Sequence, residues 1–280
     1  MTDASPETVG IVAGAGRLPF ALARGARRAG RRVLAIGFEG FADPALAAEV
    51  EAIAWVRLGE LGALLATLAA AGVHEVVVAG LVPKQQIYAS PDAIRLDARG
   101  AALLARLRDR SDDAILRALG EALEAEGIRV APQTRYADEL VAPAGVLGAV
   151  APSEAQQADV AWGWPLAKAI GRLDIGQTLV VKDKSVLAVE AVEGTDAAIR
   201  RGAALGGKGA AVLKVFKPGQ DPRFDAPTVG PETIATLAET GAALLAVEAG
   251  RTLILERAEV VARADASGIA LLGVADGGPS

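Results

Sequence analysis

The first half of the chain alternates short apolar runs with helical patterns. The apolar runs lie at 9–13, 32–37, 53–57 and 75–78, and the helical patterns at 18–29 and 60–71. Short buried strands separated by helices are typical of a parallel sheet that helices cover on both faces. The sequence therefore predicts an N-terminal α/β domain with a Rossmann-like parallel sheet.

The pattern changes in the middle of the chain. A helix expected over 112–126 and a strand over 128–131 are followed by five proline and glycine residues between positions 132 and 152. Clusters of these residues mark loops and domain boundaries. We therefore expect domains over 1–150 and 151–280, with a connecting helix over 153–170.

The second half predicts a further α/β domain with a mixed sheet. Strands over 178–182 and 186–191 follow each other in hairpin order and are joined at Asp183 and Lys184. More strands are expected at 211–216, 244–248 and near 253, with helices over 195–205 and 231–240 and a closing helix and strand. Hairpin neighbours beside strands that alternate with helices make a sheet of mixed direction.

Composition excludes several classes of protein. The 280 residues include no cysteine, which excludes disulfides and thiolate zinc sites and fits a reducing compartment. The net charge of -5 has the wrong sign for a protein that neutralises nucleic-acid phosphates. The first residues lack the basic and apolar regions of a signal peptide. We therefore expect a cytoplasmic enzyme without a nucleic-acid partner.

A glycine-rich turn follows the first predicted strand. Gly14, Ala15, Gly16 and Arg17 precede a helix, where backbone N–H groups and the helix dipole favour an anion. A dinucleotide fingerprint requires a third glycine where this chain has Pro19, which suits the first turn of a helix instead. The turn is either a phosphate-binding turn for a nucleotide or a structural connection.

The chain has one histidine and one dense basic run. His74 precedes a buried strand and is interpreted as a structural or surface residue, so a metal site would use oxygen ligands, which suits Mg²⁺ or Mn²⁺. The basic run covers the end of the first predicted helix and consists of Arg24, Arg27, Arg28, Arg31 and Arg32. It either complements the helix dipole or attracts an anionic membrane surface.

Carboxylates gather where a strand of the second half turns into a helix. The turn passes through Gly194, and Thr195 or Asp196 is expected to be the N-cap of the helix. Glu190 and Glu193 add more acids than a turn requires. Each is therefore a candidate site residue as well as a candidate structural one.

The loop after the strand at 211–216 is stiff and densely charged. Three prolines restrict its backbone between positions 222 and 231. Its charged residues are Lys214, Lys217, Asp221, Arg223 and Asp225. Carboxylates that hold a metal or orient water, beside cations that neutralise phosphate oxygens, suit the cleavage of a phosphoanhydride. We therefore expect chemistry on a phosphate-bearing substrate.

Four separated motifs together resemble a known family. They are Val12 to Pro19, Glu190 to Asp196, the stretch that contains Lys214, Lys217-Pro218-Gly219-Gln220-Asp221, Asp225 and Pro227, and Val247 to Gly250. Their order over residues 9–274 is similar to that of the LpxI-type UDP-2,3-diacylglucosamine pyrophosphatases.

This resemblance implies an enzyme of lipid A biosynthesis in Gram-negative bacteria. The expected reaction is the Mg²⁺-dependent hydrolysis of UDP-2,3-diacylglucosamine to UMP and 2,3-diacylglucosamine 1-phosphate (lipid X), in a cleft between two domains that clasp the substrate. The family's catalytic loop aspartate maps onto Asp225. The implied partners are the lipid-linked UDP-sugar and, transiently, the anionic inner face of the inner membrane, and a homo-oligomer is left open.

The resemblance and the charged segments together define a set of expected site residues. The catalytic residues are Asp225, Lys214, Lys217, Asp221 and Arg223, and the metal ligands are Asp225, Glu190, Glu193 and Asp196. The substrate contacts are Gly14, Ala15, Gly16, Arg17, Gly80, Gly194, Thr195, Gln220, Thr228 and Glu248. Further contacts at 80–86 and 112–117 are left open.

Two other functions remain as alternatives. The opening strand–helix–strand unit with Glu39 after the second strand also fits an NAD(P)-dependent oxidoreductase, although Pro19 argues against it. A non-catalytic nucleotide-sugar binding protein would keep the same motifs and release no phosphate product. Assaying UMP release from UDP-diacylglucosamine separates the three.

Overall fold

The chain forms two compact units. The computed structural model describes residues 7–82, 94–108, 111–275 and 278. One unit is Met1–Asp138 together with Asp221–Asp225, and the other is Glu139–Gln220 together with Ala226–Ser280. The first unit therefore ends before residue 150, where the sequence placed the boundary, and it takes a short segment from the second half of the chain.

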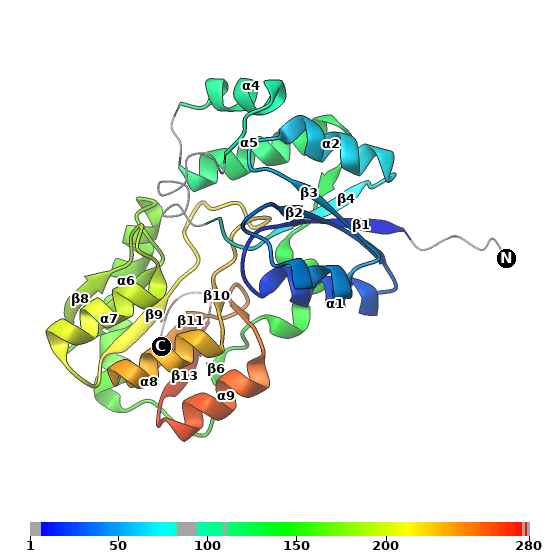
Figure 1. Ribbon diagram of the computed structural model, residues 1–280. Helices are drawn as coiled ribbons and strands as arrows, with labels where there is room; N and C mark the ends of the chain where they lie inside the picture. Colours follow the sequence, from blue (N-terminus) through cyan, green and yellow to red (C-terminus); the bar gives the residue numbers. More distant parts are fainter. Residues whose placement is uncertain (1–6, 83–93, 109–110, 276–277, 279–280) are drawn as a thin grey trace. The chain divides into compact units, whose positions relative to one another are not determined.

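The first unit contains a parallel sheet of five strands (Figure 1). Their order across the sheet is β3 (Ala52–Val56), β2 (Arg32–Phe38), β1 (Thr8–Ala13), β4 (Glu75–Ala79) and β5 (Arg129–Val130). Each neighbouring pair is parallel. The predicted Rossmann-like parallel sheet is confirmed, and the carboxyl ends of its strands lie along one edge.

Helices cover both faces of this sheet (Figure 1). Helix α1 (Leu18–Arg28) lies on one face, and α2 (Leu61–Ala70) and α5 (Asp112–Ala125) lie on the other. Alternate residues of β4, Val76 and Val78, pack with Leu68 and Leu123 from α2 and α5, as the period of a strand requires. The sequence did not predict α4 (Ala98–Arg106) or the short 3-10 helices Pro44–Glu49, Gln133–Tyr136 and Asp138–Leu140.

The second unit contains a mixed sheet of six strands. Their order is β6 (Gly145–Val146), β13 (Ala270–Val274), β11 (Leu244–Glu248), β9 (Ala211–Lys214), β7 (Thr178–Lys182) and β8 (Ser185–Val189). Strands β13, β11 and β9 are parallel, whereas β6, β7 and β8 are each antiparallel to their neighbours. The predicted mixed sheet is confirmed. A separate short pair joins β10 (Thr228–Val229) to β12 (Leu253–Ile254).

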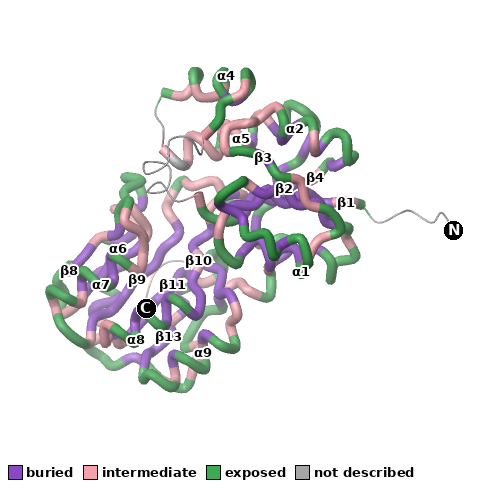
Figure 2. The backbone as a smooth tube through the Cα atoms, in the orientation of Figure 1, coloured by how far each residue is buried: buried purple, intermediate pink, exposed green. Residues whose placement is uncertain are grey.

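Two apolar layers enclose this second sheet. Helix α6 (Glu154–Arg172) contributes Trp164 to the layer that contains Leu213 of β9. The opposite layer contains Val212 of β9 with residues of α7 (Thr195–Gly206), α8 (Pro231–Thr240) and α9 (Arg257–Ala266). Because successive strand residues face opposite sides, both faces are apolar, and the strands in Figure 2 are largely buried.

Local sequence signals fix the start of α6 and the hairpin beside it. The Ser153 hydroxyl accepts from the Gln156 amide while the Gln156 side chain accepts from the Ser153 amide, a capping box. Asp183 and Lys184 both have positive φ at the β7–β8 turn, as a two-residue hairpin requires. Their amides donate to the buried carboxylate of Asp159 on α6. Within the described residues, every helix is too short or too polar to cross a bilayer.

Candidate active site

Charged side chains of the second unit gather at the carboxyl ends of two parallel strands. Lys214 is the last residue of β9 and Glu248 is the last residue of β11, its parallel neighbour. Thr195, at the N-terminus of α7, reaches the same edge and accepts a hydrogen bond from Lys214. Ligands of open α/β sheets bind beyond the carboxyl ends of the strands. This edge is therefore the candidate site of the second unit.

A chain of hydrogen bonds connects a buried lysine to a buried glutamate. The Nζ of Lys214 donates to Thr195 Oγ1 over 2.7 Å, and Thr195 Oγ1 donates to Glu190 Oε1 over 2.8 Å. Lys214 is 5% exposed and Glu190 is 8% exposed. Glu190 Oε2 is buried and has no hydrogen-bond partner among the described residues. Since an ammonium has three N–H donors, Lys214 retains donors for an anionic ligand.

The N-terminus of α7 differs from the expected capping pattern. The N-cap of α7 is Gly194, with a φ of 86° and no side-chain cap, so the prediction that Thr195 or Asp196 caps this helix is wrong. The hydroxyl of Thr195 bonds to Lys214 and Glu190 instead. Burial raises the pKa of Asp196 despite the nearby charges of Arg200 and Lys214.

Glu193 lies in the same turn but has different partners. Its carboxylate accepts from the guanidinium of Arg201 and, over 3.1 Å, from the amide of Ala191. The hydrogen bond from Arg201 lowers the pKa of Glu193. Glu193 therefore closes the turn before α7, whereas Glu190 bonds toward Lys214.

A second buried network lies where the chain leaves β9. Lys168 of α6 donates to Glu248 Oε2 over 2.7 Å and to the carbonyl of Phe216 over 2.8 Å. The amide of Phe216 donates to the same carboxylate oxygen over 2.9 Å. The guanidinium of Arg251 lies 5.1 Å from the centre of the Phe216 ring, and its Nε lies 3.5 Å from Glu248 Oε1. Glu248, predicted as a substrate contact, is 4% exposed and holds this backbone.

Sequence reasoning missed Lys168, Arg251 and Asp174. Asp174, just after α6, accepts from Lys217 Nζ over 2.7 Å, so the predicted phosphate-neutralising lysine has a carboxylate partner. No local motif marks Lys168 and Asp174, because their partners lie 80 and 43 positions away along the chain. Of the other predicted contacts, the amide of Gln220 donates to the Lys217 carbonyl, and the hydroxyl of Thr228 donates to the Ala226 carbonyl.

In the first unit, the glycine-rich turn lies between β1 and α1. The amide of Gly14 donates to the Ala79 carbonyl over 2.8 Å, and Ala15 and Leu81 exchange two backbone hydrogen bonds of 2.7 and 2.9 Å. A Cβ on Gly14 would lie 2.7 Å from the Leu81 oxygen, and one on Gly80 would lie 2.7 Å from the Ala15 oxygen. Both glycines are therefore required for the close approach of the two turns.

These bonds limit how the turn can hold a phosphate. The amides of Gly14 and Ala15 are occupied by backbone carbonyls, so a ligand would meet the later part of the turn. Gly16 and Arg17 are exposed there, and Gly16 has a φ of 94°. Of the contacts left open at 80–86, positions 83–86 lie outside the described residues.

The segment Asp221–Asp225 also belongs to the first unit. Phe224 is 2% exposed and packs in the core that contains Leu123 of α5. The guanidinium of Arg223 donates to Asp221 and to Glu124 of α5. The hydrogen bond from Arg223 lowers the pKa of Asp221.

Asp225 ends this segment in an uncommon backbone conformation. Its φ is 50°, in the left-handed region that few residues other than glycine adopt. Such strain is found at functional sites, where the surrounding structure enforces it. The residue before it, Phe224, is buried in the core of the first unit.

The structure thus divides the predicted site residues into two groups. Asp221, Arg223 and Asp225 belong to the first unit with Gly14, Ala15, Gly16, Arg17 and Gly80, although the sequence placed the three loop residues in the second domain. The second unit contains Glu190, Glu193, Gly194, Thr195, Asp196, Lys214, Lys217, Gln220, Thr228 and Glu248. Solitary His74 is exposed.

Comparisons with known proteins identify the family. The profile of the LpxI N-terminal domain matches residues 8–140, and that of the LpxI C-terminal domain matches residues 143–272. UDP-2,3-diacylglucosamine pyrophosphatase LpxI of Caulobacter vibrioides is 39% identical over 277 residues, which cover 95% of this chain and 97% of the relative. The chain belongs to the LpxI family.

Solved structures resemble parts of this LpxI-family chain at low identity. Enzyme WbmG of Bordetella bronchiseptica, in complex with NAD, is 14% identical with a TM-score of 0.29, over 46% of this chain and 37% of that one. UDP-glucose-4-epimerase of Stenotrophomonas maltophila is 11% identical with a TM-score of 0.29, over 44% and 34%. The matches span about a third of these enzymes, and scores this low carry no argument about function.

The acidic residues of the LpxI-family chain can be compared with the needs of Mg²⁺. Within the described residues, no three histidine or acidic side chains are grouped as a preformed metal site. Mg²⁺ is often bound by one or two carboxylates together with substrate phosphates. Glu190 Oε2, a buried carboxylate oxygen without a hydrogen-bond partner in the described structure, fits this mode of binding.

Proposed function

We propose that this protein hydrolyses the pyrophosphate bond of UDP-2,3-diacylglucosamine in lipid A biosynthesis. The proposed products are UMP and 2,3-diacylglucosamine 1-phosphate, and the proposed cofactor is Mg²⁺. The observation that carries the proposal is the 39% identity to the Caulobacter vibrioides pyrophosphatase along 97% of its length. The charged groups described above supply a physical reason for the same chemistry.

The two lysines are proposed to offset the charge of the diphosphate. Lys214 is buried, and its hydrogen bond to Thr195 leaves other ammonium donors for phosphate oxygens. A preformed cation in a desolvated site stabilises charge that develops on phosphate oxygens during cleavage. Lys217 is proposed to act with it, oriented by its bond to Asp174.

The acidic residues are proposed to divide into two roles. Asp225 is the proposed catalytic carboxylate, which orients or deprotonates the attacking water. Asp221 and Arg223 are proposed to fix the segment, because each already bonds to the other and Arg223 also bonds to Glu124. Mg²⁺, which would be held by Asp225 or by Glu190 and Asp196, would neutralise phosphate charge when bound.

The turn of the first unit is proposed to receive the nucleotide. Gly16 and Arg17 are exposed at the carboxyl end of β1, before the N-terminus of α1, where a helix attracts anions. Pro19 replaces the third glycine of a dinucleotide fingerprint and is buried in the first turn of α1. This turn therefore favours a UDP-sugar over a nicotinamide dinucleotide.

The deciding experiment is a product assay on the purified full chain. UDP-2,3-diacylglucosamine in detergent micelles is incubated with Mg²⁺, and UMP and the lipid 1-phosphate are measured by mass spectrometry. We expect equal amounts of both products, loss of turnover in excess EDTA and recovery with added Mg²⁺. Asp225→Asn should fold normally and lose at least about 100-fold in kcat, as expected for a general base. A wild-type chain that releases no UMP would refute the proposal.

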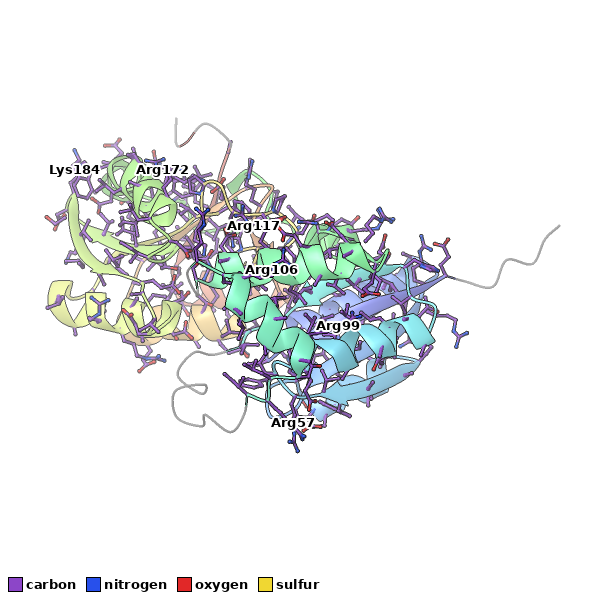
Figure 3. The ribbon with its side chains drawn as sticks, turned by 90° about the horizontal axis from the view of Figure 1, so that it is seen from above. Arg57, Arg99, Arg106, Arg117, Arg172 and Lys184 are labelled. Atoms are coloured by element: carbon purple, nitrogen blue, oxygen red, sulfur yellow. The ribbon has the colours of Figure 1, made fainter. Side chains whose placement is uncertain are left out.

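We also propose transient contact with an anionic membrane. Residues 94–108 carry four arginines and one aspartate, a local charge of +3 in a chain of net charge -5. Only Gly100 of α4 is buried, and Leu96 before it is 46% exposed. Figure 3 labels Arg99 and Arg106 on this helix, and Arg106 has no ion pair among the described residues. Basic amphipathic helices bind anionic lipid surfaces in this way.

A further inference from the structure

One face of the end of α6 contacts three consecutive residues of the loop that follows β9. Lys168 and Gly171 lie three positions apart on one face of α6, and Asp174 lies two residues beyond the end of the helix, with a φ of 54°. They contact Phe216, Lys217 and Pro218. The loop leaves the sheet at these residues and continues toward Gln220.

Lys168 makes the polar part of this contact. Its Nζ bridges the Phe216 carbonyl, at 2.8 Å, and Glu248 Oε2, at 2.7 Å. Because Glu248 Oε2 also accepts from the Phe216 amide, both polar groups of one residue are held by a single ion pair. Glu248 is removed from water, at 4% exposed, whereas the Lys168 side chain is 24% exposed. Hydrogen bonds to charged groups are the strong ones.

Gly171 and Asp174 hold the next residues by close packing and by charge. A Cβ on Gly171 would lie 3.3 Å from the Cα of Lys217 and 3.3 Å from the Cδ of Pro218. A side chain there would require Lys217 and Pro218 to move by a few tenths of an ångström. Asp174 accepts from Lys217 Nζ over 2.7 Å, so the backbone and the ammonium of Lys217 are both held from α6.

We infer that Lys168 is a positioning residue for the hydrolysis, acting through Phe216 and Glu248 on the loop that carries Lys217. This inference rests on the proposed function, because it assigns a role in that reaction. Lys168 bonds to a backbone carbonyl and to a buried carboxylate, so it fixes the point from which the loop runs to Lys217 and Gln220. Displacing groups near a reacting centre by about 1 Å can cost on the order of 100-fold in rate.

The test compares Lys168→Met with Lys168→Arg and with a matched control. Lys182→Met is the control, because Lys182 also belongs to the second unit and also donates to a backbone carbonyl, that of Gly206 at 2.8 Å. Hydrogen exchange over residues 214–220 reports the loop directly, without any need for turnover. Steady-state kinetics then separate kcat from KM, and thermal unfolding checks that the variants fold.

We expect Lys168→Met to accelerate exchange at the Phe216 and Gln220 amides by about tenfold or more, the value of a lost charged hydrogen bond. Its kcat should fall by about 10- to 100-fold, with KM changed much less. Lys168→Arg should recover most of both losses, and Lys182→Met should show neither. Gly171→Ala should lower kcat in the same way, because it displaces Lys217 without removing a hydrogen bond.

The inference is overturned if Lys168→Met exchanges at the wild-type rate over residues 214–220, or if its kcat equals that of Lys182→Met. Loss of kcat with equal acceleration of exchange throughout the second unit would also overturn it, since that pattern means general destabilisation. A wild-type chain without turnover refutes the proposed function instead, and the exchange measurement then tests the loop contact by itself.

Discussion

Replacing Phe224 with alanine should release the segment Asp221–Asp225 from the first unit while that unit stays folded. Phe224 is 2% exposed and packs in the core with Leu123. Truncation of a buried phenylalanine to alanine costs about 3–5 kcal/mol. A five-residue segment can leave the core at far lower cost than the unfolding of a five-stranded sheet.

The bonds of Arg223 do not compensate for this loss. Arg223 bonds to Asp221 and to Glu124, but the first bond lies within the segment and survives its release. The bond to Glu124 is partly exposed, and such pairs contribute about 0–1 kcal/mol. A loss of about 3 kcal/mol changes the ratio of docked to released segment by about two orders of magnitude, at 1.36 kcal/mol for each factor of ten.

Hydrogen exchange over residues 217–227, kcat and the unfolding midpoint test this prediction together. Phe224→Ala should lose protection in this segment and lose kcat, whereas Phe224→Leu should lose less of both. Phe20→Ala is the control, because Phe20 of α1 is 9% exposed and lies in the same unit outside the segment. It should lower the midpoint and leave the segment protected. A Phe224→Ala variant with wild-type protection over these residues would refute the reasoning.

Three more predictions follow from particular contacts. Burial raises the pKa of Asp196, so the charged carboxylate destabilises the folded chain above that pKa, and this penalty disappears below the ordinary pKa of an aspartate. Asp196→Asn should therefore raise the unfolding midpoint at pH 8 and have no effect near pH 3. An equal gain at both pH values would contradict this. The double variant Arg106→Gln and Arg108→Gln should bind phosphatidylglycerol vesicles about 25-fold more weakly, about fivefold for each arginine. The control double variant Arg28→Gln and Arg32→Gln should weaken binding less. Vesicle flotation measures the binding of both variants. Gly14→Ala should lower the unfolding midpoint by several degrees, because its Cβ would lie 2.7 Å from the Leu81 oxygen, and an unchanged midpoint would disprove that contact.

The fold could be predicted wherever the apolar residues of a single strand or helix recur with the period of that element. Val76 and Val78 face one layer of helices because side chains alternate along a strand, and that alternation is written in the sequence. The helix predicted from position 153 begins in the structure at a capping box of Ser153 and Gln156. Helix α4 was not predicted, although its residues are amphipathic, and only Gly100 of them is buried.

The site could be predicted only as a set of residue types. The charged loop and the acidic turn gave the candidate chemical groups, but the partners of these groups depend on contacts between distant parts of the chain. Arg223 bonds to Glu124, 99 positions away, and Lys168 bonds to Glu248, 80 positions away. No local pattern reports either contact. Phe224 carried a weak signal, as one aromatic residue within a loop of charged residues and prolines.

The chain path explains why Asp225 cannot be assigned to either unit by sequence position. Its neighbours Phe224 and Arg223 pack on α5 of the first unit, whereas the residues that lead into the segment are held by Lys168, within the second. The chain passes between the units after Asp138, after Gln220 and after Asp225. A cut at the first of these points would leave Phe224 on one fragment and its apolar partners on the other. An N-terminal fragment that ends at Asp138 would therefore lack Phe224, and the C-terminal fragment would lack the core that buries it.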